Sequence, residues 1–120
     1  MSSPAKQPGS EVAIFQAWLE QLQSVQSICT QGQWSIAQQQ YQDVQQVYQT
    51  QIVTLNLLKS KPQHQRLLTE IHRRLRLLET QLLFLKTARS PTKQQQQRTL
   101  AIEHLSAILE LAQAILGNDE

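Results

Sequence analysis

The most regular feature of this sequence is the spacing of its apolar residues, which alternates between three and four positions in four separate stretches. Because an α-helix turns once in about 3.6 residues, this spacing places the apolar side chains on one face. Each stretch therefore predicts an amphipathic helix. The four apolar seams are Phe15, Trp18, Leu22, Val25 and Cys29; Trp34, Ala37, Tyr41, Val44, Tyr48, Leu55 and Leu58; Leu68, Ile71, Leu75, Leu78, Leu82 and Leu85; and Ile102, Leu105, Leu109, Ala112 and Leu116.

Glycine and proline, the residues that most disfavour a helix interior, all fall outside these stretches. Ser10 is the predicted N-cap of the first helix, and Gly32 is the predicted left-handed residue after its end. Ser60 has capping-box spacing around Pro62, and Ser90-Pro91 repeats the pattern of a cap followed by proline. These positions predict where the helices begin and end.

The connections between the stretches are short, which makes consecutive helices antiparallel neighbours. We therefore expect an all-α fold, an antiparallel bundle of four helices, whose third helix runs from about Pro62 to Arg89. Gln51 interrupts the second seam, and Ile52 beside it is the expected replacement contact. A kink at Ser90-Pro91 in place of a reversal would instead give three core helices with a bent last helix, an arrangement suited to dimerisation by helix exchange.

The length predicts one domain, with a flexible leader at residues 1–9, a helical domain at 10–117 and an acidic tail at 118–120. The leader has no apolar core of the kind that secretory signals contain. The longest unbroken apolar run, Leu82–Leu85, is far shorter than the ~20 residues that cross a bilayer. The single cysteine, Cys29, cannot form an internal disulfide and lies on an apolar face. We expect a soluble, cytoplasmic protein with a buried thiol and no membrane partner.

The net charge of +2 conceals an uneven distribution. Residues 59–98 hold ten of the eleven Lys and Arg residues and two acids, Glu70 and Glu79, for a local charge of +8. The remainder holds Lys6 and seven acids, for a charge of −6. Much of the other polar surface is neutral, because the chain contains 23 glutamines. This asymmetry indicates where an acidic partner, or another copy of the chain, would dock.

The residues that most often carry chemistry are scattered. His64, His72 and His104 lack the close spacing of metal ligands, and the sequence has no second cysteine. Neither a glycine-rich phosphate loop nor a Gly-x-Ser-x-Gly elbow occurs. We expect no catalytic, cofactor-binding or metal-binding residues, no cofactor, and a protein that is not an enzyme.

The third stretch carries the most informative local feature, a set of cationic side chains opposite its leucines. Arg74 falls at the flank of the apolar seam, where its guanidinium group can reach water. An ordinary solvated helix face is one interpretation of this charge, and a protein-docking face is another. The predicted partner-binding residues are Arg66, Arg73, Arg76, Leu83 and Lys86.

A second apolar strip on the same stretch consists of Leu77 and Phe84, one heptad apart. The helix is therefore apolar over about half its circumference, which fits contact with two neighbours, or with one neighbour and a second subunit. Nucleic acid is the least favoured partner, because five of the six aromatic residues lie in the seams and only Phe84 is free for base stacking.

The segment Gln51–Leu55 and the run Arg74–Arg89 are followed by Gln97-Arg98 and a closing apolar helix. Together they resemble the PatD family of cyanobacteria, over roughly residues 45–116. The resemblance implies a small helical regulator of heterocyst frequency in filamentous species. It also implies direct interaction with the tubulin-like division protein FtsZ and modulation of its assembly into filaments. In a unicellular species only the division role would apply.

These observations combine into one hypothesis: a non-enzymatic protein-interaction regulator of cell division that forms a homodimer and has FtsZ as its partner. Two alternatives stay open. One is a nucleic-acid-associated helical factor, and the other is a structural, homodimeric helical adaptor.

Overall fold

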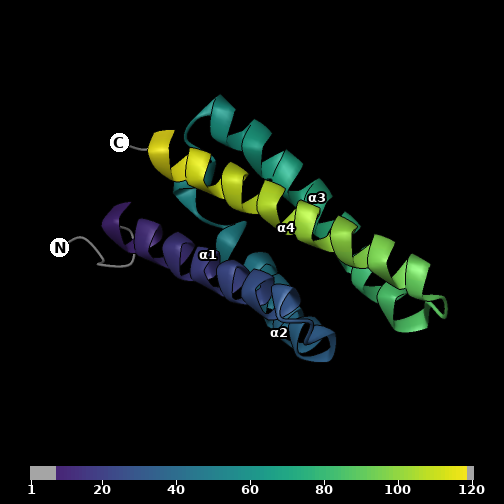
Figure 1. Cartoon of the computed structure of the whole chain (residues 1–120). Coiled ribbons are helices and arrows are strands. Elements are labelled where there is room, and N and C mark those ends of the chain that lie inside the picture. The colour runs from purple at the N-terminus through teal and green to yellow at the C-terminus, as the bar shows by residue number, and fades with distance from the viewer. Residues whose placement is uncertain (1–7, 119–120) are drawn as a thin grey trace.

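The computed structural model describes residues 8–118 and confirms the antiparallel bundle of four helices (Figure 1). Residues 1–7 and 119–120, which hold most of the predicted leader and acidic tail, lie outside the described residues. The helices are α1 (Pro8–Thr30), α2 (Trp34–Val47), α3 (Pro62–Thr87) and α4 (Pro91–Asn118).

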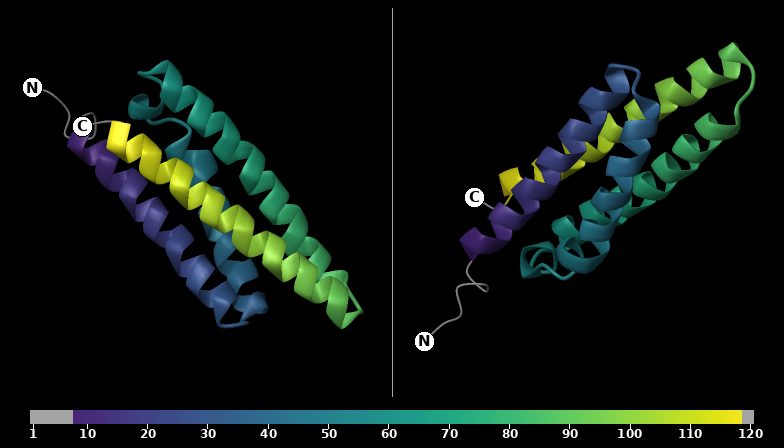
Figure 2. Two further views of the ribbon diagram at one scale, coloured as in Figure 1. Left: turned by 45° about the horizontal axis from the view of Figure 1, so that its top comes forward. Right: turned by 90° about the horizontal axis from the view of Figure 1, so that it is seen from below.

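The α4 helix lies between α1 and α3 and contacts both (Figures 1 and 2). The α2 helix packs against α1 and also contacts α3. The molecule measures 59 × 24 × 19 Å. Its length comes from the α3–α4 hairpin, whose connection extends well beyond the connection between α1 and α2 (Figure 2). The beginning of α1 and the end of α4 lie at the opposite end of the bundle.

Most residues of the predicted seams are buried and form the core, with contributions from all four helices. The half-buried exceptions are Trp34, Leu68, Leu85, Ile102 and Leu116. Trp18 anchors it, because its ring is fully buried and its indole N–H donates a hydrogen bond of 3.0 Å to the carbonyl oxygen of Val44. The Trp18 ring packs between those of Phe15 and Tyr48, with centroid distances of 5.8 and 5.5 Å. Aromatic packing of this kind joins α1 to the C-terminal end of α2.

The first helix begins at Pro8, so Ser10 lies inside α1 and the prediction that it caps the helix was wrong. Glu11, in the first turn of α1, makes a long-range contact. Its buried carboxylate accepts hydrogen bonds from the backbone N–H groups of Asn56 and Leu57, at 2.9 and 3.0 Å. Gly32 has φ +81°, the predicted left-handed conformation.

The second predicted helix is not continuous. It passes from α2 into a π-helix, η2 (Tyr48–Ile52), and a separate 3-10 helix, η3 (Asn56–Leu58), follows. The Val53 N–H donates to the Tyr48 carbonyl oxygen five residues earlier, at 3.1 Å. This extra residue per turn leaves Gln51 exposed and buries Ile52 completely, which confirms Ile52 as the replacement contact.

Of the N-caps predicted for α3 and α4, the first was wrong and the second is confirmed. The residue before α3 is Lys61, no side chain caps this helix, and the Ser60 hydroxyl donates to the Leu57 carbonyl oxygen instead. At α4, the Ser90 hydroxyl accepts the Lys93 N–H at 3.0 Å, as an N-cap does. The chain reverses at this point, so the alternative of a kinked last helix is wrong (Figure 1). The α3 helix ends at Thr87, two residues before the predicted Arg89.

One helix, over Pro91–Gly117, is long and apolar enough to cross a membrane by length and composition. Of its most apolar window, 39% is buried inside the bundle. The apolar character follows from position, because α4 contacts both α1 and α3. Gly117 was predicted to end this helix, which extends one residue further, to Asn118.

Candidate protein-interaction surface

Helix α3 presents its cationic side chains because its leucine seam is used by the core. Ile71, Leu75, Leu78 and Leu82 are all buried. Residues opposite them on a 3.6-residue helix must face solvent. All five predicted partner-binding residues are accordingly exposed, including Leu83, which keeps 57% of its surface accessible.

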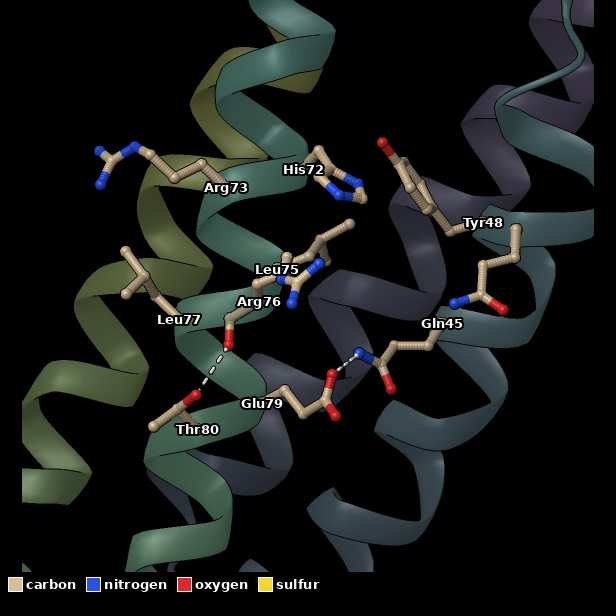
Figure 3. A pocket seen from close by; sticks show the side chains of 10 residues that line it. Gln45, Tyr48, His72, Arg73, Leu75, Arg76, Leu77, Glu79 and Thr80 are labelled. Carbon is tan, nitrogen blue, oxygen red and sulfur yellow. Dashed lines mark hydrogen bonds between the residues drawn. The ribbon is translucent and has the colours of Figure 1, made fainter.

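The structure divides these five residues between two sides of α3. Arg76 and Lys86 lie toward α2, and Leu83 shares the stripe of Arg76 one heptad further along. Arg66 lies toward α4, where it borders Leu111 and Ala114. The Arg73 side chain points away from α2, as does that of Leu77 (Figure 3).

An open cleft of about 620 Å³ lies along the α2 side. Its walls come from α2 and η2 on one side and from α3 on the other, and its lining includes Gln45, Tyr48, Gln49, His72, Arg76 and Glu79 (Figure 3). On α3 the cleft is lined by the cationic or titratable groups of His72, Arg73 and Arg76 and by the carboxylate of Glu79, and on α2 and η2 by neutral amides and an aromatic edge. Such a surface can hold acidic and amide groups of a partner by hydrogen bonding.

The two walls of this cleft are joined by long polar side chains. The Tyr41 hydroxyl donates to the Leu75 carbonyl oxygen at 2.6 Å, and the Gln38 amide donates to the Leu82 carbonyl oxygen at 3.1 Å. The Gln45 amide donates to the Glu79 carboxylate at 2.7 Å (Figure 3). Side chains of this length hold α2 and α3 together while leaving space at the surface between them.

At one end of the cleft, the Tyr48 and His72 rings lie with their centroids 6.1 Å apart (Figure 3). Tyr48 is buried, and burial raises the pKa of its hydroxyl to about 12. His72 is exposed. The two rings form an aromatic part of the cleft surface, and the Tyr48 hydroxyl stays neutral at physiological pH.

On the α4 side of α3, charges are already paired within the chain. The Arg73 Nε–H donates to the Glu70 carboxylate at 3.0 Å, and the Arg74 Nε–H donates to the same oxygen at 3.3 Å. The hydrogen bond from Arg73 lowers the pKa of Glu70, and the same contact raises the pKa of Arg73. The Arg73 side chain keeps 56% of its surface exposed, so this is a surface pair of small energetic weight.

Arg74 confirms the predicted flank position and adds a contact with α4. Its Nη1 lies 3.2 Å from Nδ1 of His104, which accepts a hydrogen bond when the imidazole is neutral. Burial lowers the pKa of His104, and the charge of Arg74 lowers it further. The pairing fixes the relative position of α3 and α4 at this level.

The groups most often involved in chemistry have structural contacts. His64 is fully buried, with Nδ1 2.6 Å from the Leu57 carbonyl oxygen. Cys29 is buried as expected, and desolvation raises the pKa of its thiol to about 11, which keeps it protonated at neutral pH. Among residues 8–118, no group of three or more His, Cys, Asp or Glu side chains is arranged to hold a metal ion.

Sequence reasoning did not identify the α2 wall of the cleft. Tyr48 was assigned to the apolar seam, and Gln45 and Gln49 were treated as surface. The one available signal was the interruption of the seam at Gln51, which marks the π-helix that carries Tyr48. π-Helical turns are frequent at functional sites.

Searches of protein-family models, curated proteins and solved structures found no match to this chain.

Proposed function

We propose that this protein is a non-enzymatic interaction module that docks an acidic protein surface on the α2-facing side of α3. The observation that carries the proposal is the exposed stripe Arg76–Leu83–Lys86 beside the open cleft. Within the described part of the chain, neither Arg76 nor Lys86 forms an ion pair. Their charges are therefore available to a partner.

The composition of this stripe fits protein recognition. An arginine beside an exposed leucine supplies both directional hydrogen bonds and apolar area, and arginine is enriched among the residues that dominate interface energies. The carboxylate that lines the cleft, Glu79, accepts a hydrogen bond from the Gln45 amide and keeps its negative charge. The cationic groups that an incoming carboxylate can meet are those of the stripe, Arg76 and Lys86.

The resemblance to the PatD family makes FtsZ the first partner to test, and regulation of its assembly in cell division the first role. Contacts led by exposed charges are screened over about 8 Å at physiological ionic strength. Binding that depends on Arg76 and Lys86 should accordingly weaken as salt concentration rises.

The test compares the wild-type chain with the double variant R76E/K86E in binding to purified FtsZ and in sedimentation of FtsZ polymers. We expect salt-sensitive binding by the wild type and a loss of about tenfold or more in affinity for the variant. The control is R66E, which makes a similar change on the α4 side of the same helix and should retain binding. Equal binding by wild type and R76E/K86E would reject this surface, and no binding by the wild type would reject FtsZ.

The nucleic-acid alternative predicts a different result. Duplex DNA should then shift in electrophoresis at low salt, and its affinity should fall by orders of magnitude as salt is raised. The cleft offers little to bases, because the Tyr48 ring is buried against Trp18.

A further inference from the structure

The outer face of the α3–α4 hairpin, on the side away from the cleft, has apolar residues that the bundle does not cover. Leu67 of α3 and Leu111 of α4 are half-buried, and Ala114 is exposed. Two adjoining shallow depressions, of about 530 and 290 Å³, share Glu70, Leu111 and Ala114. Of the most apolar window of α4, 39% is buried inside the bundle.

Charged residues of opposite sign border this face on its two helices. Arg66 is exposed on the α3 side, and Glu110 is exposed on the α4 side. Neither forms an ion pair within the described residues. Arg73 and Glu103 have the same spacing one heptad further along the hairpin, although Arg73 is paired with Glu70.

The register of the hairpin brings these charges to matching levels. Arg74 contacts His104, so the numbers of residues at the same level of the two helices sum to about 178. Leu67 and Leu111, which line one depression, are consistent with this register. Arg66 is therefore level with Ala112, two residues, or about 3 Å of helix rise, from Glu110. By the same register, Arg73 is level with Leu105, two residues from Glu103.

We infer that this face binds a second copy of the chain, with a two-fold axis parallel to the helices. This rotation places the faces of the two copies against each other, with α3 of each copy on α4 of the other. Each residue keeps its position along the helix direction. Each Arg66 then meets the partner's Glu110, and the Leu67–Leu111 surfaces meet at the centre. An axis across the helices would instead set α3 on α3, and would bring cationic helix faces together.

The choice of a second copy rests on this self-complementarity. An isologous interface needs both members of every contact on one surface. Here a single face carries Arg66 and Glu110 on either side of the Leu67–Leu111 surface, with the Glu70 carboxylate lining both depressions. The inference does not depend on the function proposed above, because the docking stripe lies on the opposite side of α3.

The test is a charge exchange between two variants, measured by analytical ultracentrifugation of the whole chain. R66E makes both of these bordering positions acidic, and E110R makes both basic. Each variant alone should dimerise at least about tenfold more weakly than wild type, because both symmetric contacts become repulsive. An equimolar mixture should restore a species of twice the 13.8 kDa chain mass, since both contacts in the heterodimer are again complementary.

Two further variants separate this surface from general effects. A114E places a charge at an exposed position in the centre of the face and should also produce monomers, with unchanged helical circular dichroism. R76E, on the cleft side, should leave the dimer intact. A monomeric wild type at about 100 µM, a dimer unaffected by R66E and E110R, or a mixture that stays monomeric would each overturn the inference.

Discussion

The Tyr41 hydroxyl group donates its hydrogen bond to the carbonyl oxygen of Leu75, and so connects α2 to α3 from a buried position. Burial raises the pKa of this hydroxyl well above its usual value, so the proton stays in place for donation. We expect Y41F to lower the free energy of unfolding by about 1 kcal/mol, because one buried hydrogen bond is lost without a change in packing.

Tyr48 supplies the matched control for that experiment. Its ring is also buried, but its hydroxyl makes no hydrogen bond within the described residues. Y48F should therefore change stability by less than Y41F in urea denaturation. Equal losses in the two variants would show that the Tyr41–Leu75 contact contributes little.

Glu11 should be more important than its position in the first turn of α1 suggests. Its carboxylate accepts two backbone hydrogen bonds from η3, and E11A would leave the N–H groups of Asn56 and Leu57 without acceptors. We expect a loss of about 2 kcal/mol in the free energy of unfolding, since each buried unsatisfied donor is costly. E20A, at an exposed acid on the same helix, is the control and should be nearly neutral.

Ser90 and Ser60 test whether a cap signal in sequence corresponds to a cap in the fold. S90A removes the acceptor of the Lys93 N–H and should cost about 1 kcal/mol. S60A removes only a hydroxyl that donates to Leu57, outside any helix cap, and should cost less. Thermal denaturation of the two single variants gives the comparison, and a larger effect for S60A would contradict the assignment.

His104 predicts a pH dependence of stability. Its pKa is lowered in the folded state from the ordinary value of 6.5, by burial first and by Arg74 second, with Glu103 opposing. Above that ordinary value the imidazole is neutral in both states, and its contribution is fully present. As pH falls below it, the unfolded chain binds the proton first, so stability decreases until the pH passes the folded-state pKa.

The measurement is the free energy of unfolding at about pH 7.5 and pH 5.5 for wild type and for H104Q. Glutamine keeps an acceptor for Arg74 but does not titrate. Wild type should lose more stability than H104Q over this interval. An identical loss in both proteins would assign the pH dependence to other groups.

Sequence signals predicted those helix ends whose geometry depends only on neighbouring residues. Ser90-Pro91 gave the cap of α4, and Gly32 gave the left-handed end of α1, because both depend on residues within one turn. Ser60 failed because Lys61, and not Ser60, is the residue that precedes α3, and the Ser60 hydroxyl is directed to the Leu57 carbonyl oxygen. The position of Leu57 depends on Glu11, which is 46 residues away in sequence. No pattern near Ser60 carries that information.

The candidate surface shows the same limit. The helical period correctly placed Arg66 and Arg76 on the solvated face of α3, opposite its leucines. The period of one helix does not state which neighbour lies on each flank. Only the packing of α2 and α4 assigns Arg76 to the cleft and Arg66 to the hairpin's outer face.

The α3–α4 hairpin extends beyond the α1–α2 connection, so we expect two parts of the molecule to open in different ways. Around Trp18, four helices must separate together, so opening there is a global event. Beyond the α1–α2 connection, the hairpin of α3 and α4 extends without α1 and α2 beside it (Figure 2). Amide hydrogens near this tip should exchange with solvent through local fraying, while the rest of the bundle stays folded. The tip should therefore be the more flexible part of the hairpin, and the four-helix part should unfold only cooperatively.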